Sequence, residues 1–116
     1  MSIPSRRILQ RARERIQSVR AALAGFELIC SGTLSERWNT CGKPTCACAS
    51  DPAARHGPYY QWIRMRAGKP AQRYVSAQQA QILRQAIDNY RQLKKLLRDW
   101  ELNTERIIDA EQPPAP

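Results

Sequence analysis

The chain has 116 residues, of which 42% are hydrophobic, and a formal net charge of +9 at pH 7. A chain of this length can bury about 65% of its unfolded surface, which favours a single domain. The sequence contains no apolar run of about 18 residues, which excludes a membrane span, and the Arg-rich residues 1–25 lack the apolar core of a signal peptide, so a cytoplasmic location is predicted.

The positive charge is unevenly distributed along the chain. Residues 1–76 contain 13 basic and four acidic residues, whereas residues 77–116 contain six of each. The excess therefore lies entirely in the first two thirds. This asymmetry favours a polyanionic partner, although an Arg-rich helix can also be no more than a solvated surface.

Residues 4–24 are predicted to form an N-terminal helix. Its apolar residues recur at alternating steps of three and four and form one seam, which consists of Leu9, Ala12, Ile16, Val19, Leu23 and Phe26. Six Arg residues and a single Glu make this helix cationic, with Arg6, Arg13 and Arg20 beside the seam.

A three-stranded antiparallel sheet is predicted within residues 28–75. Segments 31–39, 59–66 and 71–75 are rich in aromatic and branched residues, and a turn at 67–70 joins the last two as a hairpin.

We expect the helices to cover one face of this sheet, because a small sheet must bury one side. The other face can then carry several basic residues: Arg37, Arg64, Arg66, Lys69 and Arg73. Tyr60 and Trp62 alternate with basic residues on the second strand and are candidates for stacking on unpaired bases.

The segment between the first two strands contains metal-ligand residues. Cys41, Cys46, Cys48 and His56, the only histidine, lie within 16 residues. Three thiolates and one imidazole are a standard structural set for zinc, which takes four ligands in a tetrahedron, and a cytosolic location argues against disulfides. We therefore predict one structural Zn²⁺ per chain, which would order a long loop.

His56 has two competitors as the fourth ligand. Either Cys30 or Asp51 could take its place. His56 is favoured because Arg55 and Gly57 place it at a polar turn near the other ligands, whereas Cys30 lies in an apolar run and is typical of a small core residue.

Residues 77–109 are predicted to form a long C-terminal helix that begins with a Ser76–Gln79 capping box. Its apolar residues hold coiled-coil heptad positions, namely Leu83, Ala86, Tyr90, Leu93, Leu97, Trp100, Thr104 and Ile107. The two helices can pair as an antiparallel hairpin. Because the longer helix would keep exposed apolar residues, we expect self-association through the helices, most simply as a dimer.

Together these elements predict the α+β class with the order αβββα. We expect a single zinc-binding domain over residues 1–110, followed by a disordered tail at 111–116.

Four runs of residues resemble a family of short prokaryotic proteins. They are Ser-Gly-Thr-Leu-Ser-Glu-Arg-Trp at 31–38, Cys-Gly-Lys-Pro-Thr-Cys-Ala-Cys-Ala at 41–49, His-Gly-Pro-Tyr-Tyr at 56–60 and Arg-Tyr-Val at 73–75. The family is known only as a domain of unknown function and is often encoded beside transposases. The resemblance extends from residue 29 to residue 100 and implies a metal-bound αβββα unit connected with mobile DNA, without implying an activity.

Nucleic-acid binding, with double-stranded DNA favoured over RNA, is the function that the sequence indicates best, as an accessory or regulatory protein of mobile elements. The candidate contact residues are Arg6, Arg13, Arg20, Arg37, Lys43, Arg64, Arg66, Lys69 and Arg73. The alternative is a zinc-ordered protein-interaction or oligomerisation module that meets an acidic protein and binds no nucleic acid.

Catalysis and a small-molecule substrate are not expected. Four protein ligands would leave a zinc ion no open position. The sequence also has no second histidine and no Gly-rich phosphate loop.

Overall fold

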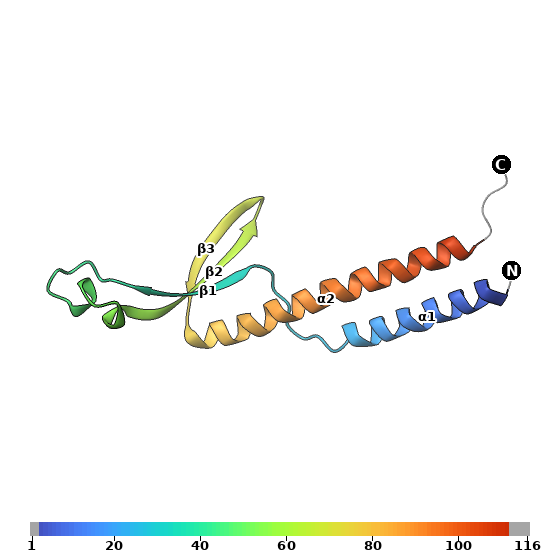
Figure 1. Ribbon diagram of the computed structural model, residues 1–116, viewed down its shortest axis with the longest axis horizontal. Helices are drawn as coiled ribbons and strands as arrows, with labels where there is room; N and C mark the ends of the chain where they lie inside the picture. The colour runs from blue at the N-terminus through green and yellow to red at the C-terminus, as the bar shows by residue number, and fades with distance from the viewer. Residues whose placement is uncertain (1–2, 112–116) are drawn as a thin grey trace. The chain divides into compact units, whose positions relative to one another are not determined.

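The computed structural model describes residues 3–111 and has the predicted α+β architecture, in which one helix precedes and one helix follows a three-stranded antiparallel sheet along the chain (Figure 1). Its main elements are α1 (Ile3–Leu23), β1 (Thr33–Asn39), β2 (His56–Arg66), β3 (Lys69–Val75) and α2 (Ala77–Ala110). Residues 112–116 of the predicted disordered tail lie outside the described residues. Neither described α-helix is both long and apolar enough to cross a membrane.

The described residues form two compact units. One unit, here called the helical unit, contains α1 and the part of α2 that follows Asp88. The other, the sheet unit, consists of Cys30–Asp88 and contains the sheet and the first turns of α2. The extent of a single domain over residues 1–110 stays a prediction.

The sheet unit has the strand order β1-β2-β3 and buries one face against α2. The core contains Trp62 of β2 with Leu83 and Ile87 of α2, and Cys30, Leu34 and Val75 pack against it. The Trp62 indole Nε1 donates a hydrogen bond to the Ser31 carbonyl at 3.0 Å, so its polar atom is satisfied.

The first turn of α2 has the predicted capping box. The backbone N–H of Gln79 donates to Oγ of Ser76 at 3.1 Å, and the backbone N–H of Ser76 donates to Oε1 of Gln79 at 2.8 Å. This reciprocal pair satisfies donors that the helix itself cannot, and it fixes where α2 begins.

The predicted turn at 67–70 is wrong by two residues. Lys69 and Pro70 belong to β3, where they pair with Arg66 and Met65 of β2. Ala67 and Gly68 have φ values of 52° and 78°, and two consecutive positive φ values close a two-residue hairpin whose twist matches that of the strands.

In the helical unit, α1 and α2 run antiparallel, as the sequence predicts (Figure 1). The α1 seam is confirmed, because Ala12 and Val19 are buried and the other four seam residues are half-buried. The predicted α2 seam is partly wrong: Leu97 and Thr104 are exposed, whereas Leu96 is half-buried and Asn103 is buried. Leu96 and Leu97 lie about 100° apart around the helix, and the side on which α1 packs decides which of the two is buried.

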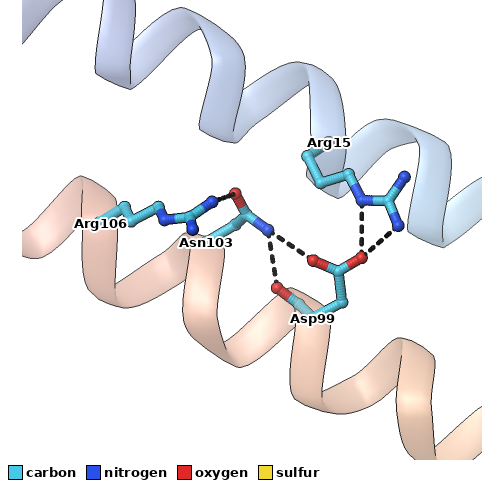
Figure 2. A network of polar contacts seen from close by, with 4 residues as sticks. All are labelled: Arg15, Asp99, Asn103 and Arg106. Atoms are coloured by element: carbon cyan, nitrogen blue, oxygen red, sulfur yellow. Dashed lines mark hydrogen bonds and ion pairs between the residues drawn. The ribbon is translucent and has the colours of Figure 1, made fainter.

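Asn103 is only 1% exposed, and the network in Figure 2 holds it. Its Nδ2 donates to the backbone carbonyl and to Oδ1 of Asp99, both at 2.8 Å, while its Oδ1 accepts from Nη1 of Arg106 at 3.2 Å. Asp99 also accepts from Nε of Arg15 on α1 at 2.6 Å. A buried amide is stable here because both of its ends are hydrogen-bonded.

Candidate metal centre and cationic hairpin face

The β1–β2 connection brings together the four predicted metal ligands. Cys41 lies two residues after the end of β1, Cys46 is the N-cap of the short 3₁₀-helix Ala47–Ala49, and Cys48 lies within that helix. His56 is the first residue of β2, where it pairs with Asn39 of β1. His56 was expected in a turn, and its place at the end of a ladder means that the sheet itself positions the imidazole.

The four donor atoms lie close enough together to surround one ion. Sγ of Cys41 lies 3.5 Å from Sγ of Cys48, and Sγ of Cys46 lies 3.4 Å from Nε2 of His56. All four donor atoms lie within 4.8 Å of one another. With Zn–S near 2.3 Å and Zn–N near 2.0 Å, a tetrahedron has S···S and S···N separations of about 3.8 and 3.5 Å. The cluster could therefore hold a metal ion.

Hydrogen bonds and burial shift the pKa values of two thiols of the cluster in opposite directions. The backbone N–H of Cys41 donates to Sγ of Cys48 at 3.4 Å, and Cys48 is only 3% exposed. Hydrogen bonding from the backbone of Cys48 and from the Cys48 and Cys41 thiols lowers the pKa of Cys46. The pKa of Cys48 is raised overall. The hydrogen bond from the Cys41 backbone acts to lower this pKa, but burial and the neighbouring thiols of Cys46 and Cys41 outweigh it.

The two competing ligands have other roles. Cys30 packs against the core of the sheet unit, and its backbone N–H donates to the Ala86 carbonyl at 3.1 Å. Asp51 caps the second 3₁₀-helix, Pro52–Ala54, by accepting from the backbone N–H of Ala53 at 3.0 Å. His56 is therefore the fourth member of the cluster.

Gly57 lets the strand pass close to its neighbour directly after His56. Its φ is +149°, and a β carbon there would lie 2.8 Å from the Arg37 carbonyl and 3.1 Å from the Trp38 ring. Only glycine fits this approach. Gly57 thus helps to place His56, a role that the sequence analysis missed although the Gly-Pro pair after the ligand is visible in the sequence.

Four of the predicted nucleic-acid contacts share one face of the β2–β3 hairpin. The register pairs Arg66 with Lys69 and Trp62 with Arg73, and alternation adds Arg64 to the same face. We call Arg64, Arg66, Lys69 and Arg73 the cationic hairpin face. Within residues 3–111, none of the four forms an ion pair.

The expectation that these cations lie opposite the covering helix is wrong. They share the face of Trp62, which packs against α2, and only Arg37 points to the other side. The part of that face that packs against α2 is formed by Leu34, Trp62 and Val75, whereas Arg66, Lys69 and Arg73 stay exposed and Arg64 is half-buried.

Aromatic rings orient part of this face. The Arg64 guanidinium lies 3.9 Å from the centroid of the Trp62 ring, and that of Arg73 lies at 5.9 Å. Burial of Trp62 removes it as a base-stacking candidate, and Tyr60 is half-buried under Arg84. The more exposed rings of the β2–β3 hairpin are those of Tyr59 and Tyr74 on the opposite face, whose centroids are 6.3 Å apart.

The remaining predicted contact residues lie elsewhere. Arg6, Arg13 and Arg20 are exposed on α1 in the helical unit, at steps of seven along one side of the helix. Lys43 is exposed in the loop with the cysteines, and Arg37 is exposed on β1. The structure therefore divides the predicted contact residues between the two units.

A family model described as Domain of unknown function (DUF6788) matches residues 6–85, and the chain belongs to this family. The match includes most of α1, whereas the resemblance noted above begins only at residue 29. No curated protein and no solved structure matches the chain.

Proposed function

We propose that this chain binds nucleic acid, with duplex DNA as the preferred form, through the cationic hairpin face. The observation that supports this proposal best is the side-by-side arrangement of Arg66 and Lys69, with Arg64 and Arg73 on the same face and no acidic partner within the described chain. Unpaired cations held on one face can replace the counterions that surround DNA phosphates.

The shape of the hairpin suits the major groove. This groove is about 12 Å wide and admits a two-stranded β-ribbon, and Arg side chains there can bond guanine through two donors. The Arg64 side chain is pre-oriented by its stacking on Trp62, which lowers the entropy lost when it binds a phosphate or a base.

Zinc is the metal that we propose for the cluster of Cys41, Cys46, Cys48 and His56, at one ion per chain. Thiolates combined with an imidazole in a closed set suit zinc better than the oxygen-preferring Mg²⁺ or Ca²⁺. Four protein donors leave no open position, so the proposal assigns zinc a structural role and no reaction. The ion would tie the start of β2 to the loop that precedes it.

An accessory or regulatory role in mobile DNA is part of this proposal. Its support is the resemblance to proteins encoded beside transposases, together with the cationic hairpin face. The preferred target sequence is left to experiment.

Fluorescence anisotropy with a labelled 20-base-pair duplex tests the proposal. Binding should be micromolar or tighter at 50 mM salt, and four phosphate contacts predict a slope of log K against log salt of about −3 to −4. A matched single strand and an RNA duplex serve as comparisons. Absent binding at low salt, or an affinity that salt leaves unchanged, would contradict the proposal.

The alternative function is a zinc-ordered protein-interaction module without nucleic-acid binding. The observation that favours it is the uncovered sheet face, where Tyr74 and Met65 are 62% and 64% exposed. Purified protein that retains no polynucleotide and binds none in the titration would favour this alternative. Retained polynucleotide that high salt or nuclease removes would favour the first proposal.

A further inference from the structure

The second half of α2 has more apolar surface than α1 covers. Three columns of residues, each spaced by seven, run along this part of the helix. They are Leu96, Asn103 and Ala110; then Leu93, Trp100 and Ile107; and then Tyr90, Leu97 and Thr104. The first two columns are buried or half-buried. In the third column Tyr90 is half-buried, but Leu97 is 42% exposed and Thr104 is exposed.

We call this third column, with the adjacent Ile108, the second seam of α2. Ile108 is 64% exposed and follows Thr104 at i+4, so it extends the exposed strip that contains Leu97, and a continuous apolar strip marks an interaction surface where a single exposed residue does not. A depression beside Leu97 and Thr104 is lined by Trp100, Glu101 and Glu105. The column of Leu93, Trp100 and Ile107 therefore lies between two apolar surfaces of α2. One surface packs against α1, and the other is the second seam.

The charged residues that flank the second seam are ordered by sign. Lys94 and Arg98 come first along the helix, and Glu101 and Glu105 follow. At about 100° per residue these four side chains lie within about 60° of one another around the helix. Nζ of Lys94 lies 5.3 Å from the Tyr90 ring, which places this flank next to the seam.

This order of charges is unfavourable within one chain. Lys94 and Arg98 are like charges at i and i+4, and so are Glu101 and Glu105, and such pairs destabilise an isolated helix. Arg98 and Glu101, at i and i+3, are the one opposite pair at such a spacing among the four, so the unfavourable pairs outnumber the favourable one. None of the four has an ion pair with another residue between 3 and 111.

We propose that a second copy of this chain covers the second seam, with its α2 antiparallel to the first. In an antiparallel helix pair the same flank of both helices meets. Lys94 then faces Glu105 of the partner subunit, and Arg98 faces Glu101 of the partner subunit. Both pairings put the two-fold axis at the same level of the helix, between Asp99 and Trp100, so the two contacts are consistent with one symmetric interface.

A parallel helix pair would not bring these opposite charges together. In a parallel pair this flank would meet the opposite flank of the partner helix, on the side that α1 occupies, and the like charges would stay uncompensated. The charge order therefore selects the antiparallel dimer, and this choice does not depend on nucleic-acid binding.

Sedimentation velocity of the full chain without nucleic acid, from about 5 to 500 μM, tests the dimer. The wild-type chain should shift to twice the monomer mass as concentration rises. Ile108→Lys should raise the dissociation constant at least tenfold. Ile82→Lys is the matched control, because Ile82 lies on the same helix, is 58% exposed and is outside the second seam, so its dissociation constant should stay within threefold.

A charge exchange tests the orientation. The double variant Lys94→Glu, Arg98→Glu should weaken the dimer at least tenfold, and adding Glu101→Lys and Glu105→Lys should restore the wild-type constant to within about threefold. Circular dichroism confirms that each variant is helical. A wild-type chain that stays monomeric at every concentration, or a fourfold variant that is no tighter than the double variant, would overturn the proposal.

Discussion

Nε2 of His56 lies 3.4 Å from Sγ of Cys46, although His56 begins a strand and Cys46 lies in the loop before it. Because the β1–β2 ladder fixes His56 and two short 3₁₀-helices shape the loop, this contact joins the rigid and the irregular parts of the sheet unit. A metal ion held at this point would connect the two parts directly.

Replacing one cysteine of the cluster should therefore remove the metal and weaken the sheet unit. We expect Cys48→Ala to lose stoichiometric metal and at least about 2 kcal/mol of unfolding free energy, because binding energy at such a site is folding energy. The measurements are elemental analysis and chemical unfolding.

Cys30→Ala is the matched control for this variant. Cys30 packs against the core instead of the cluster, so its loss should lower stability modestly and leave the metal content unchanged. Equal metal loss in both variants would show that the ligand set is misassigned.

Gly32 permits a close approach between the chain before β1 and the strand beside it. Its φ is +116°, and a β carbon would lie 2.5 Å from the Ile63 carbonyl and 2.6 Å from Nε1 of Trp62. Gly32→Ala should cost about 2–4 kcal/mol, since it combines backbone strain with displacement of a core tryptophan.

Gly68→Ala separates these two contributions. Gly68 also has a positive φ, +78°, but nothing lies within 4 Å of its added β carbon. We expect a loss of only about 1 kcal/mol, from the left-handed conformation alone. Urea titration of both variants would contradict this account if Gly68→Ala were the more damaging.

The two residues of the Arg15–Asp99 ion pair should contribute unequally to the free energy of unfolding, because Asp99 also accepts a hydrogen bond from the buried Asn103. The Arg15 side chain is 56% exposed, so Arg15→Ala should cost no more than about 1 kcal/mol. Asp99→Ala also removes an acceptor from the buried Asn103 amide and should cost about 1–3 kcal/mol. Thermal unfolding that ranks Arg15→Ala as the more destabilising would contradict the role assigned to Asn103.

Loss of one cation from the hairpin face should reduce the salt dependence of DNA binding. Arg66→Ala removes an exposed residue that does not stack on Trp62, so we expect the slope of log K against log salt to fall by about 1. Lys95→Ala removes the same charge from α2 and should leave the slope unchanged. Equal effects would show that only net charge matters.

Local patterns in the sequence predict several elements well. The capping box at Ser76 and Gln79, the seam of α1 and the spacing of the three clustered cysteines depend on residues close in the chain, so their physical basis is visible without the fold. The preference for His56 over Cys30 has the same basis, because the apolar run around Cys30 is visible in the sequence.

The faces of the sheet could not be predicted in this way. Alternation correctly separates Trp62 from Ile63, but which side meets α2 depends on the register and on the few residues that the helix covers. The choice of Leu96 over Leu97 at the helix pair likewise depends on where α1 lies. Both features depend on tertiary contacts, which cannot be derived from the spacing of residues along one helix or strand.

X-ray absorption spectroscopy at the zinc edge, on tag-free protein with its metal content measured in parallel, tests the central claim most directly. We expect one zinc ion per chain with three sulfur ligands at about 2.3 Å and one nitrogen ligand at about 2.0 Å. A chain without stoichiometric metal, or an ion surrounded only by oxygen and nitrogen, would contradict the account.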